Sequence, residues 1–75
     1  SKNVGQKDYK TVLQEKLQQS GSVHIEYNIL KEEGPDHNKS FTAEVKCDGK
    51  QLAIGKGTSK KSAEMEAARK AIELV

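Results

Sequence analysis

The feature that most limits how this chain can fold is a set of three short strand-like segments, in the first two of which apolar and polar residues alternate. They are "VHIEYNIL" (23–30), "FTAEVKC" (41–47) and "KQLAIGK" (50–56). A period of two puts successive side chains on opposite faces of a strand, so the first two segments predict strands with one buried face, and the third predicts a short strand beside them. Asp48-Gly49, between the second and third segments, is typical of a type I′ hairpin turn. The chain therefore predicts an antiparallel meander with one face to be covered.

Two stretches with helical spacing flank these strands and can supply the cover. The first begins at Asp8, a good N-cap, ends near Gly21 and carries an apolar stripe of Tyr9, Val12, Leu13 and Leu17. The second follows Thr58 and Ser59 and aligns Ala63, Ala67, Ala68, Ala71, Ile72 and Val75 on one face. We expect an α+β fold, an α-β-β-β-α two-layer sandwich with both helices packed on one face of a three-stranded antiparallel sheet. Residues 1–7 are expected to be a linker and residues 8–75 the domain.

The composition fits one small soluble module. The 75 residues are 33% hydrophobic and 32% charged. No apolar run reaches the roughly 18 residues that cross a bilayer, so we expect no membrane association. The one cysteine, Cys47, cannot form an internal disulfide, which fits the cytoplasm. His24, His37 and Cys47 have no recognised ligand spacing, so no metal site is expected.

The start of the second helix is unusually basic. Lys60 and Lys61 fall in its first turn, where the helix dipole disfavours cations. Free backbone N–H groups at a helix N-terminus bind anions, so two added lysines make sense if the ligand is phosphate. Gly55 and Gly57 are expected to keep the approach open. The alternative is that both lysines extend into water.

The solvent face of the first helix is neutral instead of basic. Its residues follow the spacing i, i+3, i+4 and i+7 and are Thr11, Gln14, Glu15 and Gln18. Such side chains suit hydroxyls and base edges, and RNA presents 2′-hydroxyls in the shallow minor groove of its duplex. An ordinary solvated helix face is the alternative.

The loop between the first two strands contains "GPDHNK". Pro35 stiffens the turn, and His37 near its tip can both donate and accept hydrogen bonds. An ordinary polar loop is the alternative.

Four segments in order, "KDYKTVLQEKLQ", "GPDHNKSFTAEV", "DG" and "GKGTSKKSAEMEAARKAI", resemble a double-stranded RNA-binding domain. The likeness is to the domain at the C-terminal end of bacterial ribonuclease III, and it covers about Lys7 to Val75. It implies that one minor groove meets the face of the first helix and that the next meets Pro35 and His37. It also implies that Ser59, Lys60 and Lys61 bind the phosphates between them, with Glu64 one turn further along the helix.

The same resemblance implies a parent enzyme. Ribonuclease III is a magnesium-dependent, homodimeric endoribonuclease that processes precursor RNAs, including ribosomal RNA, and its acidic nuclease domain is not in this chain. The acids here are scattered, whereas two-metal hydrolysis needs converging carboxylates. We therefore expect a monomeric binding domain for double-stranded RNA, with no catalytic residue, cofactor or small-molecule substrate. The other readings are an enzyme, a single-stranded RNA binder and, foremost, a protein-interaction or dimerisation module of the same fold.

Overall fold

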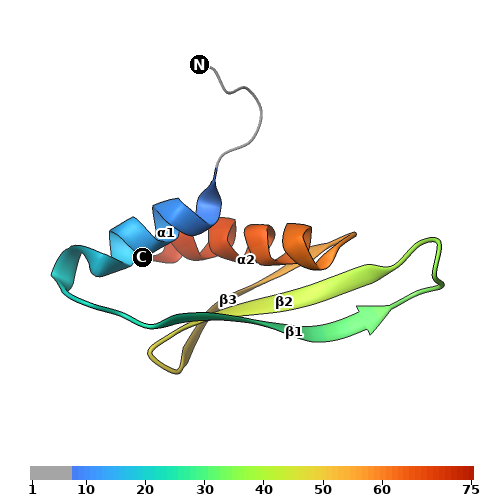
Figure 1. Cartoon of the computed structure of the whole chain (residues 1–75), viewed down its shortest axis with the longest axis horizontal. Helices are drawn as coiled ribbons and strands as arrows, with labels where there is room; N and C mark the ends of the chain where they lie inside the picture. The colour runs from blue at the N-terminus through green and yellow to red at the C-terminus, as the bar shows by residue number, and fades with distance from the viewer. Residues whose placement is uncertain (1–7) are drawn as a thin grey trace, which may run out of the picture.

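The computed structural model describes residues 8–75, and the predicted linker 1–7 lies outside the described residues. Its elements are α1 (Tyr9–Leu17), the 3-10 turn η1 (Gln18–Ser20), β1 (Ile25–Glu33), β2 (Ser40–Cys47), β3 (Lys50–Gly57) and α2 (Lys60–Leu74). The strands form one antiparallel sheet of order β1-β2-β3, and both helices lie on the same face of it (Figure 1). The predicted α-β-β-β-α sandwich is confirmed. Within residues 8–75, neither helix is long and apolar enough to cross a membrane.

The hairpin between β2 and β3 has the predicted turn. Asp48 and Gly49 have φ angles of 51° and 85°, as the two central residues of a type I′ turn require. The turn is also tied to the chain that enters β1. The His24 N–H donates to Asp48 Oδ1 at 2.9 Å, and the Asp48 N–H donates to the His24 carbonyl at 2.8 Å. This pair of bonds fixes one end of the sheet.

The first strand differs from its prediction at both ends. It begins at Ile25 instead of residue 23 and continues to Glu33 instead of residue 30. A register shift between Ile29 and Lys31 leaves Leu30 as a bulge, with 49% of its surface exposed. Figure 1 shows β1 and β2 extending past the start of α2, so the sheet there has no helix to cover it. Because neither face of this part of β1 is covered by a helix, its apolar and polar residues do not alternate. The loop between β1 and β2 is therefore shorter than predicted and comprises residues 34–39.

The core lies between α2 and the sheet and is built mainly from small side chains. The fully buried residues are Leu13, Ala43, Val45, Ala63, Ala67, Ala68 and Ala71. Since alanine projects only a methyl group, the α2 backbone can approach the strands closely. Ile72 packs against this core as predicted, but Val75 does not. Val75 follows the last helical residue and is 48% exposed.

The first helix begins as predicted and ends slightly early. The Asp8 carboxylate caps it by accepting from the Thr11 N–H at 3.2 Å. The helix stops at Leu17, and Gln18 opens a 3-10 turn that closes at Gly21, where φ is 134°. Gln18 is the C-cap of α1, and its N–H still donates to the Gln14 carbonyl, so it stands one helical turn after Gln14 at the end of the helix.

The helix-free face of the sheet carries a buried carboxylate. Ala43 and Val45 face the core, so Glu44 between them points to the opposite side. It is nevertheless only 7% exposed. Its carboxylate accepts from Gln51 Nε2 at 2.8 Å and from Asn28 Nδ2 at 3.0 Å. These bonds, with that from Gln51 the stronger influence, hold the pKa of Glu44 below its ordinary value.

Candidate nucleic-acid interface

Three predicted contact residues of α1 are exposed, and the fourth is exposed in the turn after it. Thr11, Gln14 and Glu15 lie on α1, and Gln18 lies in η1. The Thr11 hydroxyl donates to Asp8 Oδ2 at 2.7 Å. Because its hydrogen is thus committed, that oxygen keeps its lone pairs for an incoming donor. The same bond, together with the Thr11 N–H, lowers the pKa of Asp8. The surface therefore offers acceptors and amides close to the start of the helix.

The first turn of α2 is a cationic helix terminus. A capping box closes it, in which the Ser59 hydroxyl accepts from the Ser62 N–H at 3.0 Å and the Ser62 hydroxyl accepts from the Ser59 N–H at 3.0 Å. Lys60 and Lys61 are exposed, and this turn contains no acidic residue. Their N–H groups precede the first intrahelical bond, from the Ala63 N–H to the Ser59 carbonyl. Backbone donors and two ammonium groups thus gather at one helix end, which suits an anion.

The two glycines before this helix have a different role from the expected one. A Cβ on Gly55 would lie 2.2 Å from the backbone nitrogen of Ala67, and a Cβ on Gly57 would lie 2.7 Å from that of Ala63. Both positions therefore face the backbone of α2. The expectation that they keep a phosphate approach open is replaced by a packing requirement: only glycine lets β3 and α2 approach this closely.

The loop between β1 and β2 is exposed but has a firm base. Pro35 and His37 are exposed, and the Pro35 carbonyl accepts from the Asn38 N–H at 2.9 Å, which closes a turn. At the base of the loop, Lys39 Nζ donates to Glu32 Oε2 at 2.5 Å. The pKa of Glu32 is lowered chiefly by Lys39 and also by the charge of Lys60. The loop base is therefore electrostatically linked to the start of α2.

Glu64, the last predicted contact residue, is half-buried and already has a partner. Its Oε1 accepts from Lys10 Nζ at 2.5 Å, which joins α2 to α1. All the other predicted contact residues are exposed.

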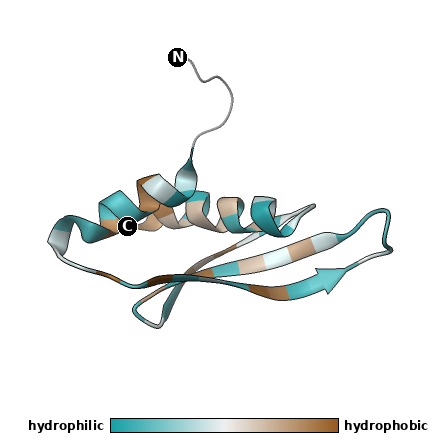
Figure 2. Ribbon diagram, in the orientation of Figure 1, coloured by the Kyte–Doolittle hydropathy of each residue, from teal (hydrophilic) through white to brown (hydrophobic). Residues whose placement is uncertain are grey.

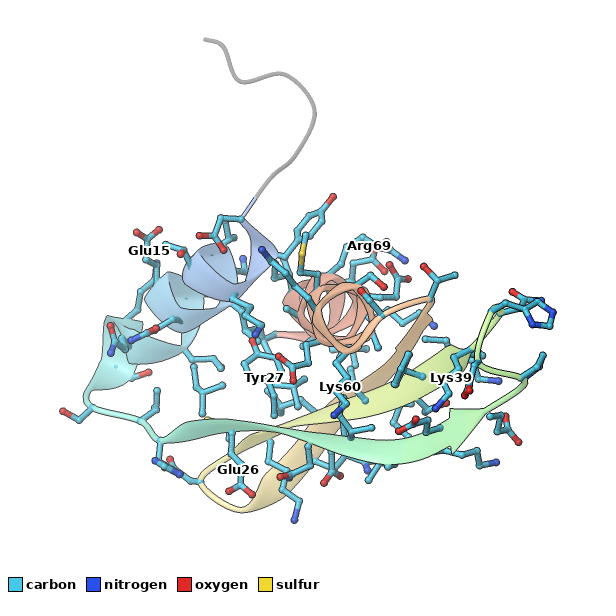
Figure 3. All side chains as sticks on the ribbon, turned by 45° about the vertical axis from the view of Figure 1, so that its right-hand side comes forward. Glu15, Glu26, Tyr27, Lys39, Lys60 and Arg69 are labelled. Carbon is cyan, nitrogen blue, oxygen red and sulfur yellow. The ribbon has the colours of Figure 1, made fainter. Side chains whose placement is uncertain are left out.

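The predicted residues form an extended surface and not a pocket. In Figure 1 the start of α2 lies between α1 and the β1–β2 loop along the long direction of the molecule. Figure 3 shows Glu15 projecting from the outer side of α1, while Lys60 reaches toward β1. Figure 2 shows hydrophilic residues across the loop and the end of β1. This spacing fits a ligand that is long, and does not fit a small molecule held at one point.

Sequence reasoning missed two residues that connect these groups. Lys10 and Lys39 both lie in the motifs of the resemblance, but no role was assigned to either. Their partners, Glu64 and Glu32, lie 54 and 7 residues away. The first pair joins two helices that are distant in the sequence, and the second lies across the loop between β1 and β2, so only the folded structure reveals the pairs.

The chain is similar in sequence to proteins of known family. The family described as the double-stranded RNA binding motif matches residues 9–75. Ribonuclease 3 of Pelotomaculum thermopropionicum is 57% identical over 67 residues, which is 89% of this chain and 28% of that protein. Ribonuclease 3 of Lactococcus lactis is 59% identical over 66 residues, which is 88% of this chain and 29% of that protein. The chain thus spans less than a third of the length of these relatives. From the family match over nearly its whole length, the chain belongs to the double-stranded RNA binding motif family.

Proposed function

We propose that this chain binds double-stranded RNA by its shape, through two minor grooves and the phosphates of the major groove between them. The observation that carries the proposal is the sequence of surfaces along the molecule: a neutral helix face, a cationic helix terminus and an exposed loop. Membership of the double-stranded RNA binding motif family supports it independently. Domains of this kind span about 16 base pairs and read form more than sequence.

The helix face is proposed to read ribose. Thr11, Gln14, Glu15 and Gln18 offer hydroxyl, amide and carboxylate groups without a lysine among them. The 2′-hydroxyl of RNA both donates and accepts, so it can bond to each of these groups, whereas DNA has no such group. A carboxylate at Glu15 disfavours nearby phosphate and favours a hydroxyl donor. This face therefore accounts for a preference for RNA over DNA.

The helix terminus is proposed to hold phosphate. Ser59, Lys60 and Lys61 combine a hydroxyl, two ammonium groups and the N-terminal end of α2. Phosphate contacts of this kind position a protein without reading sequence and make binding depend on salt. Pro35 and His37 are proposed to enter the second minor groove, with His37 as hydrogen-bonding group. Glu64 lies at the edge of the phosphate site, next to α1.

The similarity to ribonuclease 3 proteins also supports a proposal about the parent protein. We propose that this chain is the RNA-binding part of a cytoplasmic ribonuclease III that processes precursor RNAs and works as a homodimer. No three His, Cys, Asp or Glu side chains come together as metal ligands within residues 8–75. We assign no magnesium-dependent step to these residues. In this proposal the chain supplies binding, and hydrolysis belongs to another part of the parent.

The deciding experiment is a set of binding isotherms on the 75-residue chain. A duplex RNA of about 20 base pairs is compared with an RNA–DNA hybrid, a DNA duplex and a single strand of equal length. The duplex RNA should bind most tightly and the single strand most weakly. Equal affinity for duplex and single-stranded RNA would contradict the proposal. If the chain does not bind RNA and self-associates in sedimentation, the result would support a protein-interaction module instead. Cleavage of the duplex in the presence of Mg²⁺ would contradict a role limited to binding.

A further inference from the structure

One side chain connects three elements of the fold. Lys10 lies in the first turn of α1, and its Nζ donates to Glu64 Oε1 in α2 at 2.5 Å. The same ammonium group stands 4.5 Å from the ring centroid of Tyr27 in β1. Figure 3 shows Tyr27 between the two helices and the sheet. We call these three residues the helix brace.

The surroundings of the brace restrict its movement. The side chains of Lys10 and Glu64 are 38% and 23% exposed, so water reaches each of them only in part. A cation between a carboxylate and an aromatic face has two attractive partners in different directions, which limits the positions it can take. The Tyr27 hydroxyl is buried and has no hydrogen-bond partner among the described residues. Tyr27 therefore contributes to the helix brace through its ring more than through its hydroxyl.

The brace joins the two parts of the surface that the proposed function uses together. Lys10 immediately precedes Thr11 and stands one helical turn before Gln14. Glu64 stands one turn after Lys60 and Lys61. The link therefore runs between the start of the neutral helix face and the start of the cationic helix terminus. The brace is therefore one of the contacts between the elements that carry these two patches.

We infer that Lys10 and Glu64, with the ring of Tyr27 beneath them, are positioning residues that hold the α1 face at the spacing an RNA duplex requires from the α2 lysines. The inference rests on the proposed function. In a duplex, the distance from a minor groove to the neighbouring phosphates is fixed. A protein whose two patches are already held at that distance loses less freedom on binding than one whose patches move independently.

A positioning role for Lys10 and a direct contact between Lys10 and RNA predict different salt dependences of binding. If Lys10 only positions α1, its removal weakens binding but leaves the number of phosphate contacts unchanged. The slope of log affinity against log salt is then the same as for the wild type. If Lys10 itself binds phosphate, the slope falls by about one unit. Salt dependence therefore separates a positioning residue from a phosphate ligand.

The test uses Lys10→Met, Glu64→Gln and the reversed pair Lys10→Glu with Glu64→Lys, each in the 75-residue chain. Circular dichroism first establishes a temperature at which every variant is folded. At that temperature the two single variants should bind a duplex RNA of about 20 base pairs roughly threefold to tenfold more weakly, at unchanged salt slope. The reversed pair should recover part of the affinity, because it restores the ion pair but not the attraction between a cation and the Tyr27 ring. Lys70→Met, which removes an exposed lysine elsewhere on α2, is the control and should bind like the wild type.

A second measurement does not depend on RNA. Residual dipolar couplings of the free protein report how well α1 is ordered relative to α2, and Lys10→Met should lower this order while Tyr27→Phe should not. Unchanged order in Lys10→Met overturns the inference, whether or not the wild type binds RNA. A reduced salt slope in Lys10→Met without recovery in the reversed pair also overturns it, in favour of a direct contact. Failure of the wild type to bind duplex RNA refutes the proposed function, while the couplings still decide whether the brace orders the helices.

Discussion

The backbone of α2 at Ala67 lies so close to Gly55 of β3 that a Cβ at position 55 would be 2.2 Å from the Ala67 nitrogen. The carbonyl carbon of Glu66 and the carbonyl oxygen of Ala63 would lie at 2.6 and 2.8 Å from the same Cβ. All three are backbone atoms, so no side chain can move aside. The close approach sets the depth at which α2 rests on the sheet, and with it the position of the lysines at its start.

Gly55→Ala should therefore destabilise the domain strongly. Overpacking a well-filled core lowers the free energy of unfolding by about 1–3 kcal/mol. Because the added methyl group would meet backbone atoms that cannot move aside, we expect a loss of about 3 kcal/mol. Urea unfolding followed by circular dichroism measures the loss. Ile54→Ala is a matched control, because Ile54 is adjacent in β3, partners Glu44 on the helix-free face and is 40% exposed. It should cost about 1 kcal/mol or less. Equal losses in both variants would contradict the packing role of Gly55.

Lys60→Ala and Lys61→Ala should weaken duplex binding for every sequence alike. Each lost phosphate contact should reduce the slope of log affinity against log salt by about one unit, because fewer counterions are released. Titrations at several salt concentrations measure both quantities. Lys70→Ala, at an exposed position further along α2, should leave them unchanged. If the double variant keeps the wild-type slope, these lysines do not bind phosphate.

Gln14→Ala and Glu15→Ala should act on a different property, the preference for RNA over DNA. Their side chains are exposed on α1 and are proposed to bond to 2′-hydroxyls, which DNA lacks. Affinity for duplex RNA should fall while affinity for duplex DNA stays nearly constant. Parallel isotherms on the two duplexes give the ratio, and Gln19→Ala, in η1, is the comparison variant. A ratio equal to that of the wild type would exclude the proposed reading of ribose.

Acid should destabilise the domain partly through Glu44. Its folded-state pKa lies below the ordinary value of 4.5, because Gln51 and Asn28 donate to the ionised carboxylate. The contribution of ionised Glu44 to the stability of the fold is therefore present above about pH 4.5. It is lost as the pH falls through the lower pKa of the folded state. Gln51→Ala should move the pKa of Glu44 upward, as measured by NMR titration of its carboxyl carbon. Identical titration curves for wild type and variant would show that the amide does not hold the charge.

Alkali should act through Tyr27. Burial, together with the negative charges of Glu64 and Asp8, raises the pKa of its phenol from 10 to about 12. The unfolded chain releases this proton near pH 10 and the folded chain near pH 12, so the stability from this group declines between those values. NMR titration of the Tyr27 ring gives the folded value, and Glu64→Gln should lower it. A ring that titrates at pH 10 in the folded protein would refute the assignment.

Local sequence alone determined the elements and their order. Alternation marked β2 to within one residue, Asp48-Gly49 marked the turn that leads into β3, and Thr58 and Ser59 marked the start of α2. These features depend on neighbours a few residues apart, whose backbone preferences act without the rest of the chain. The buried alanine face of α2 was predictable for the same reason.

The tertiary structure decided what these elements do to one another. The extension of β1 to Glu33 depends on pairing with β2 beyond the helices, and the role of Gly55 depends on where α2 comes to rest. The Lys10–Glu64 pair joins residues 54 positions apart, and the Glu44 carboxylate meets its partners Asn28 and Gln51 only because they lie on the neighbouring strands. Periodicity tells which face of an element is buried. It does not tell which distant side chain that face will meet, because this depends on the distance and angle at which whole elements pack.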